Sequence, residues 1–208
     1  MPKFTAYVAA ISLAAMASAT SAQNYSTDRY DVGELRDSEG CFIGGDWSLP
    51  GRSQINFEID QLTNGELYVG VWSYGWSRPT ADTSKVLGVV FWPTGGGERQ
   101  VFVMIAVPTG VQLGDGEPGL FAIVPEERRA EFLSTFSGSQ SFTVVTRDMD
   151  AAEGTPFDTI LEGNLAGSSL AVSRMQNCVR DVRQREDARR QREAGVAHIE
   201  RDPFRRGE

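Results

Sequence analysis

Apolar and polar residues alternate in two neighbouring stretches, residues 55–59 and 67–71. A period of two is typical of a strand that buries one face. A three-residue loop at positions 63–65 sets Val69 opposite Ile59 on one apolar face, whereas a slip of one residue would turn every side chain over. We therefore predict a hairpin with this register, in which the glycine that ends the loop takes a left-handed conformation.

Two longer runs, residues 86–92 and 100–107, are apolar on both faces, which predicts a pair of central strands. Residues 93–98 lie between them, contain three consecutive glycines and supply the turn. Shorter stretches with strand character follow at residues 120–124, 141–146 and 157–165.

Two helices accompany these strands. Pro125 suits the first helical position, two glutamates follow it where the helix dipole favours acids, and Gly138 ends the run. The second helix begins at Ser168 or Ser169, either of which can cap it. Its apolar stripe consists of Val172, Met175, Val179 and Val182. We expect this helix to continue outward into solvent until about Gly195.

These elements together predict a mostly β fold: a β-sandwich-like domain with one short helix and a C-terminal helix. We place the domain at residues 41–182. Residues 23–40 are polar and lack periodicity, which predicts a flexible lead-in. Residues 183–208 are expected to form a charged helical or disordered tail.

Residues 1–22 have the three parts of a secretory signal. Lys3 is the only charge before Asp28, an apolar middle follows it, and small residues end the stretch at Ala22. The apolar run is shorter than the roughly 20 residues that a membrane-spanning helix needs. We therefore expect cleavage after Ala22, or alternatively after Ala19, export to the periplasm or beyond, and no membrane span after cleavage.

Cys41 and Cys178 are the only cysteines of the chain. Two lone cysteines most often pair in an oxidising compartment, and this bridge would close a loop of 178 − 41 = 137 residues. Two buried free thiols are the alternative. A single histidine leaves a zinc site without ligands, and we predict neither a metal nor a cofactor.

Charge is divided unevenly along the chain. Residues 23–173 hold 9 basic and 21 acidic side chains (9 − 21 = −12), whereas residues 174–208 hold 10 and 7 (10 − 7 = +3). The acids in the tail favour a solvated helix with ion pairs four residues apart, at Arg183–Asp187, Glu186–Arg190 and Arg189–Glu193. We predict no nucleic-acid partner. The arginine-rich tail would instead dock onto a partner protein or an anionic surface.

Three aromatic residues at alternate positions are the strongest candidate for a binding site. Trp72, Tyr74 and Trp76 point to one face of an extended segment, and Trp47 and Trp92 are expected nearby. Aromatic faces provide large contact areas at low entropic cost, so such a platform could hold a sugar or a peptide. The alternative is that these rings form the core of the sandwich or cover its rim.

Catalytic motifs do not stand out in the sequence, and we predict no catalytic residues. The lone His198 lies in the tail, where it cannot be held as a general base. The loop Asp148–Gly154 does not match a calcium-binding loop and reads as a solvated turn. Spacing singles out no pair among the carboxylates that we considered, Asp46, Asp60, Asp115 and Asp148.

Several stretches within residues 84–182 resemble the invasion-associated locus B family. They are the strand, "P-x-G-V-x-L-x-x-G" turn and following strand at 101–116, the helix ending and strand at 136–145, and the last strand, turn and "G-x-x-x-A" helix start at 157–171. The chain departs from the family at residues 121–129, where it has no cysteine. The resemblance implies a secreted or periplasmic β-sandwich of an α-proteobacterium, associated with the envelope or with host entry and without known catalytic chemistry.

We therefore expect a non-enzymatic exported protein that binds another macromolecule, protein or glycan, of the envelope or of a host. Trp72, Tyr74 and Trp76 are the candidate binding residues. The alternative is a glycan-directed hydrolase that uses two carboxylates.

Overall fold

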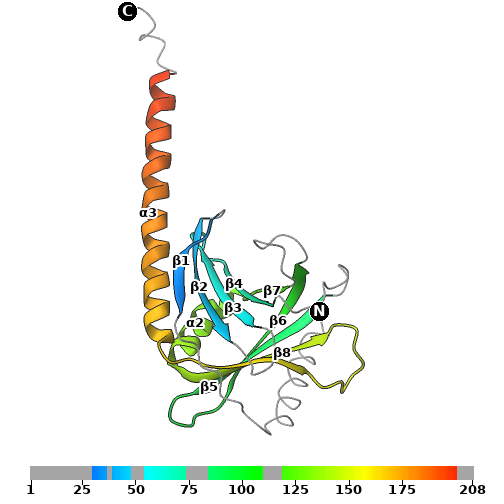
Figure 1. The fold of residues 1–208 in the computed structure, drawn as a ribbon. Helices are drawn as coiled ribbons and strands as arrows, with labels where there is room; N and C mark the ends of the chain where they lie inside the picture. Colours follow the sequence, from blue (N-terminus) through cyan, green and yellow to red (C-terminus); the bar gives the residue numbers. More distant parts are fainter. Residues whose placement is uncertain (1–29, 37–38, 48–53, 74–83, 110–118, 201–208) are drawn as a thin grey trace, which may run out of the picture.

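The computed structural model describes residues 30–36, 39–47, 54–73, 84–109 and 119–200, and Figure 1 shows their arrangement. They form a mostly β, sandwich-like domain with one short helix and a C-terminal helix, as the sequence predicts. The expected signal segment lies outside the described residues.

Nine antiparallel strands form one sheet in this part of the chain, in the order β1-β2-β3-β4-β7-β6-β5-β8-β9. Strands β5 and β6 are each paired on both sides, which confirms their predicted central position. The bounds are β1 Asp31–Glu34, β2 Gly40–Trp47, β3 Ile55–Leu62, β4 Leu67–Trp72, β5 Lys85–Pro93, β6 Gln100–Thr109, β7 Gly119–Ile123, β8 Ser139–Asp148 and β9 Asp158–Asn164.

The β3–β4 hairpin has the predicted register. Val69 is the partner of Ile59 and Val71 is the partner of Phe57, and all four side chains are buried in the core. Gly65 has a φ of 91°, the left-handed conformation that the three-residue loop requires. The apolar alternation and the loop length together therefore decide which face of this hairpin is buried.

Strands β1 and β2 were not predicted. Strand β1 lies inside the expected flexible lead-in, so that prediction is wrong for residues 31–34. Strand β2 has the sequence GCFIGGDW, in which three glycines hide any alternation. All eight of its residues pair with β3, so a neighbouring strand of strong amphipathic character makes up for the weak local preference of β2.

Helix boundaries differ from the expected ones at two points. Pro125 precedes a short 3₁₀ turn, η1 (Glu126–Arg128), and the α-helix α2 begins only afterwards (Arg129–Gly138). Helix α3 (Ser168–Glu200) begins at a predicted cap but continues past Gly195. Helix α3 has 33 residues, which at 1.5 Å per residue corresponds to roughly 50 Å.

The sheet bends so that strands from its two ends share one aromatic core. Trp47 on β2 packs edge-to-face on Phe142 of β8, with ring centroids 5.3 Å apart. Phe57 on β3 lies 4.8 Å from the same Phe142 ring, and Phe136 of α2 lies 6.3 Å from Phe57. Aromatic pairs of this kind add about 0.5–1.5 kcal/mol each beyond area burial.

Helix α3 covers β1 and β2 with its first half and extends well beyond the sheet with its second (Figure 1). The predicted apolar stripe is confirmed, since Val172, Met175, Val179 and Val182 are all buried. From residue 183 to 194 the helix buries no apolar side chain. Packing therefore anchors the first half, and the second half is a polar projection.

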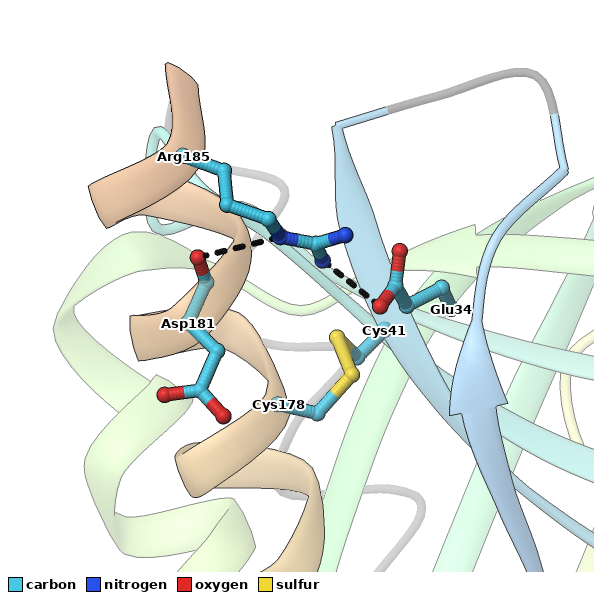
Figure 2. The surroundings of a disulfide bond; sticks show 5 residues. All are labelled: Glu34, Cys41, Cys178, Asp181 and Arg185. Carbon is cyan, nitrogen blue, oxygen red and sulfur yellow. Dashed lines mark hydrogen bonds and ion pairs between the residues drawn. A yellow bond between two sulfur atoms is a disulfide. The ribbon is translucent and has the colours of Figure 1, made fainter. Parts of the chain in front are cut away.

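A disulfide joins α3 to β2, as predicted from the two cysteines. The Cα atoms of Cys41 and Cys178 are 6.1 Å apart, and the bond closes a sequence separation of 137 residues. Figure 2 shows Arg185 about two turns further along α3, where it donates to Glu34 on β1 at 2.6 Å and to the carbonyl of Asp181 at 3.4 Å. The final helix is thus fixed covalently to β2, near the edge of the sheet. The sequence patterns of β1 and β2 do not by themselves predict these two strands.

Candidate functional site

The outer face of the sheet, opposite the core, carries an unusual set of side chains. Its members come from five adjacent strands, β2, β3, β4, β7 and β6, and the strand register puts them on one side. They are Phe42, Glu58, Asp60, Tyr68, Trp72, Phe121, Ile123, Ile105 and Val107. We refer to these nine residues as the outer-face site.

Trp72 belongs to the outer-face site and not to the core. Its ring stacks on Phe121 of β7, with centroids 6.1 Å apart and an interplanar angle of 20°. With the Asn56 amide oriented to donate to Asp46, its oxygen accepts a hydrogen bond from the Trp72 Nε1–H at 3.1 Å. The Trp72 ring is therefore fixed on one face and at its polar edge.

The other aromatic candidates do not join Trp72 on the described part of this face. Tyr74 and Trp76 lie outside the described residues. Trp47 is 1% exposed and belongs to the core, so the expectation that it lies near the platform is wrong. Trp92, one residue before the end of β5, lies on the outer face as well, but two strands separate β5 from β4; its Nε1–H donates to the Thr143 hydroxyl on β8 at 3.4 Å and the Arg99 guanidinium lies 4.7 Å from its ring centroid.

Aliphatic side chains continue the outer-face site beyond Phe121. Val107 on β6 is the partner of Phe121 on β7. Ile105 and Ile123 lie two residues further along these two strands, on the same face. Ile105, Val107 and Ile123 are 46%, 57% and 53% exposed. We call these three residues the aliphatic ridge.

Two carboxyl groups, Glu58 and Asp60, lie on the outer face of β3 at alternate positions. The partners of Glu58 are Gly44 on β2 and Gly70 on β4, which offer it no side chain. The ring of Phe121 leans over Gly70, where an added Cβ would overlap it. Glu58 is therefore half-buried between two glycines, and the space above these glycines is filled by Glu58 itself, Phe42 and the Phe121 ring.

Aromatic residues neighbour the carboxyl pair in the strand register. The ring of Phe42 lies between Gly33 on β1 and Gly44, and would lie 3.0 Å from a Cβ at Gly33 and 3.6 Å from a Cβ at Gly44. Asp60 pairs directly with Phe42 on β2 and with Tyr68 on β4. Asp60 is only 9% exposed, and its Oδ1 is buried without a hydrogen-bond partner. A buried, unsatisfied carboxylate oxygen costs about 1–3 kcal/mol or more.

The two carboxyl groups share a proton. Burial, followed by the charge of Asp60 and by a hydrogen bond with it, raises the pKa of Glu58 to about 9. Burial also raises the pKa of Asp60, to about 6, although the hydrogen bond from Glu58 opposes this rise. At neutral pH the pair therefore holds one proton between its two carboxyl groups.

The sequence offers only a faint indication of this pair. Two acids at alternate positions of a half-buried strand look like an ordinary solvated face. Their burial depends on Gly44, Gly70 and the rings that lean over them, and these come from other strands. Of the carboxylates considered from sequence, Asp46 is partner to Asn56 on β3, Asp148 forms an ion pair with Lys85, and Asp115 lies outside the described residues.

The geometry of the carboxyl pair does not suit glycoside hydrolysis. The two acids of such enzymes stand about 5–9.5 Å apart to admit the sugar bond or a water molecule. Glu58 and Asp60 are instead hydrogen-bonded to each other. Among the described residues, no three His, Cys, Asp or Glu side chains gather in a way that could hold a metal ion.

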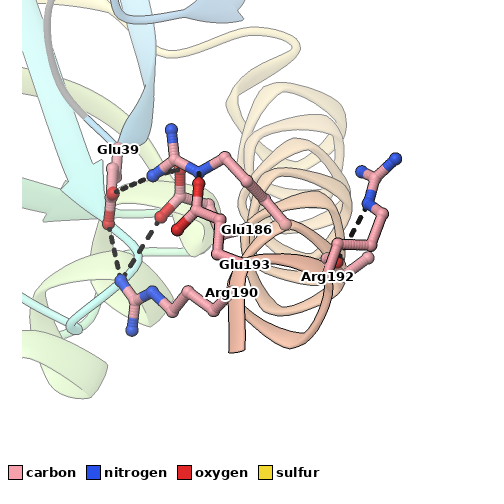
Figure 3. A network of polar contacts seen from close by, with 7 residues as sticks. Glu39, Glu186, Arg190, Arg192 and Glu193 are labelled. Atoms are coloured by element: carbon pink, nitrogen blue, oxygen red, sulfur yellow. Dashed lines mark hydrogen bonds and ion pairs between the residues drawn. The ribbon is translucent and has the colours of Figure 1, made fainter. Parts of the chain in front are cut away.

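The projecting half of α3 carries a separate cluster of charges, shown in Figure 3. Glu39, just before β2, forms ion pairs with Arg190 at 3.3 Å and with Arg189 at 3.6 Å. Within the helix, two of the predicted pairs form, Glu186–Arg190 at 3.4 Å and Arg189–Glu193 at 3.8 Å. Arg183 donates instead to the carbonyl of Thr63. These contacts hold the base of the projection against the sheet.

Comparison with known proteins found no matching family model, no matching curated protein and no matching solved structure. Among the helices of the described residues, none combines the length and the apolar character needed to cross a bilayer.

Proposed function

We propose that this chain is an exported, non-catalytic protein that binds a segment of another protein against the outer-face site. The observation that carries the proposal is the aliphatic ridge. Burying a large aliphatic side chain fully contributes about 1.5–3 kcal/mol, and contiguous exposed apolar patches commonly mark interaction surfaces. Three exposed side chains beside Phe121 and Trp72 offer a partner such a contact.

A protein fits this surface better than a glycan. Sugars stack on free aromatic faces and bond with polar groups around them. One face of the Trp72 ring already contacts Phe121, and its Nε1–H is already used by Asn56. Ile105, Val107 and Ile123 offer a sugar no hydrogen bond, whereas they suit the apolar side chains of a peptide segment.

Export is supported by the disulfide, since such bonds persist in oxidising compartments. The signal-like first 22 residues and the resemblance to the invasion-associated locus B family point the same way. On this proposal the partner is a protein of the envelope or of a host cell surface.

Photo-crosslinking from inside the ridge tests the proposal. A crosslinking amino acid at Val107 in the full chain, expressed in its native cells, is expected to trap one partner reproducibly. The combined change of Ile105 and Ile123 to serine is expected to remove that adduct and to weaken binding of the purified partner at least tenfold. The matched control is the crosslinker at Leu170 on α3, which is equally exposed at 57%. An identical adduct from Leu170, or one that survives the serine changes, contradicts the proposal.

A further inference from the structure

We infer that one half of β6, Gln100–Ile105, receives an extended segment of the bound protein as an added strand. The inference rests on the function proposed above and specifies the partner: an extended segment with apolar side chains at alternate positions. This half of β6 leads directly into the aliphatic ridge, since Ile105 ends it and Val107 lies two residues further on. A segment bound to the ridge therefore lies next to the backbone of this half-strand.

Strand β7 covers only one end of β6. Strand β6 has 10 residues, of which the four residues Ala106–Thr109 pair with β7 (10 − 4 = 6 remain). The six remaining residues pair with β5 on the other side of the strand. After β7 the chain stays with β4, where the Val124 amide donates to the Leu67 carbonyl at 2.9 Å, and then enters η1. Outside the strand ladders, no backbone hydrogen bond of the described residues involves positions 100–105.

Unpaired backbone groups along a strand are a template for another strand. In an antiparallel pair, alternate residues point both the N–H and the C=O group toward the same neighbour. Half of the backbone groups of Gln100–Ile105 therefore point away from β5, toward the side where β7 has ended. Each of these groups gains a hydrogen bond when an extended segment pairs there, which is the binding mode known as β-strand addition.

The two outermost strands of the sheet are protected against such pairing, whereas this part of β6 is not. Helix α3 packs against β1. Strand β9 carries Asp158 and Glu162, and an irregularity at Val144 and Val145 interrupts its pairing with β8. Charges, bulges and covering helices are the usual means by which proteins keep edge strands from pairing. Residues 100–105, QVFVMI, have no charge, no proline and no bulge in their pairing with β5, and this contrast favours a strand partner.

The position of this edge favours a single extended segment over a second copy of the domain. The edge lies inside the strand order, because β7 and β4 continue the sheet beyond it. A strand that already belongs to another sheet brings a neighbouring strand with it, and that neighbour would have to occupy the place of β7 and β4. An extended segment without neighbouring strands avoids this conflict.

The two faces of β6 define the side chains that the segment should carry. Val101 and Val103 lie half-buried on the outer face, in line with Ile105, so the outward positions of the segment favour apolar residues. On the core side, the Arg128 guanidinium lies 4.3 Å from the centroid of the Phe102 ring. The inward positions therefore meet a positive charge. We expect apolar residues that alternate with serine, threonine or glutamate.

Hydrogen exchange on the full, disulfide-bonded chain tests the edge itself. In the free protein, alternate amides of Gln100–Ile105 are expected to exchange at least a hundredfold faster than the amides between them, which donate to β5. Uniform protection overturns the inference, because the edge would then be closed already. Protection that rises with protein concentration also overturns it, because a second copy would then be the occupant.

A library of blocked heptapeptides, in which valine, leucine or isoleucine alternates with serine, threonine or glutamate, is the probe for strand addition. The peptide that binds best is expected to protect the fast amides. N-methylation of every second peptide amide removes donors but keeps the side chains. It is expected to weaken binding at least tenfold at one set of alternate positions and less than threefold at the other set. Equal losses for both sets, or no protection at millimolar peptide, overturn the inference.

A matched pair of variants places the peptide on this edge. Val103→Lys adds a charge of the kind that protects natural edge strands, and it is expected to weaken binding of the peptide at least tenfold. Thr159→Lys on β9 is the control and is expected to bind the peptide like the unchanged protein, so equal losses contradict the inference. The N-methylated peptides are tested on the unchanged protein, so that result does not depend on how the variants fold.

The cellular adduct from Val107 separates this inference from the proposed function. An adduct without strand addition overturns the inference alone, because the ridge then binds its partner through side chains. Strand addition without an adduct overturns the proposed function alone, because the free edge then exists without a partner on the ridge.

Discussion

At the scale of single residues, the most unusual feature is an outer-face carboxyl pair whose burial disfavours the charged form of both groups. Glu58 and Asp60 are hydrogen-bonded to each other, and Glu58 is flanked by Gly44 and Gly70. A strand position of this kind tolerates threonine or glutamine without such a cost. Groups whose pKa is strongly shifted and which lie on a binding face are reasonable candidates for function.

The pair predicts how stability depends on pH. Because the folded pKa of Glu58 is about 9 against 4.5 for the ordinary group, the folded protein binds the extra proton between these values. Stability is therefore retained at low pH and falls as pH rises through this window, by at most about 1.4 kcal/mol per unit for one proton. Urea unfolding of Glu58→Gln at pH 5, 7 and 9 is expected to show a flatter profile and higher stability at pH 9. Parallel profiles for Glu58→Gln and the exposed control Asp158→Asn contradict this account.

At the scale of elements, the sequence predicts the amphipathic strands and helices. It does not predict a strand that forms mainly because a neighbouring strand pairs with it. The β3–β4 register follows from alternation and a loop glycine, and the α3 stripe follows from helical spacing. Strand β2 has no such pattern and exists because β3 pairs with its whole length. The site divides in the same way, since Trp72 stands out in the sequence while the carboxyl pair depends on Gly44 and Gly70.

Strand β9 offers a test of how tightly the curved sheet is packed. A Cβ added to Gly163 would lie 2.5 Å from both Phe142 and Trp47, two rings of the closed core. Gly163→Ala is therefore expected to lower the free energy of unfolding by about 1–3 kcal/mol, as overpacking usually does. Gly138→Ala, where nothing lies within 4 Å, is the control. Similar chemical-denaturation midpoints for the two variants would show that the sheet opens more easily than the ring contacts imply.

At the scale of the whole molecule, α3 has two separate tasks. Its first half completes the core against β1, β2 and α2, and its second half carries charge away from the sheet. The ion pairs at the base of the projection are largely exposed, and such pairs contribute only about 0–1 kcal/mol. The sequence predicts both halves, because the apolar stripe stops where the acid–base spacing begins.

The disulfide is what makes the whole molecule depend on its compartment. Closing a loop of this size reduces the entropy of the unfolded chain by an amount worth about 4–5 kcal/mol, less any residual structure of that chain. Reduction, or Cys41→Ser with Cys178→Ser, is expected to lower the stability by a large part of this amount. Hydrogen exchange is expected to rise first in β1, β2 and α3, because these elements depend on one another rather than on strong local patterns. The β3–β4 hairpin serves as the internal reference. Equal loss of protection in both regions would mean that the bond stabilises the domain uniformly, and α3 would then be part of the same cooperative unit as the central strands.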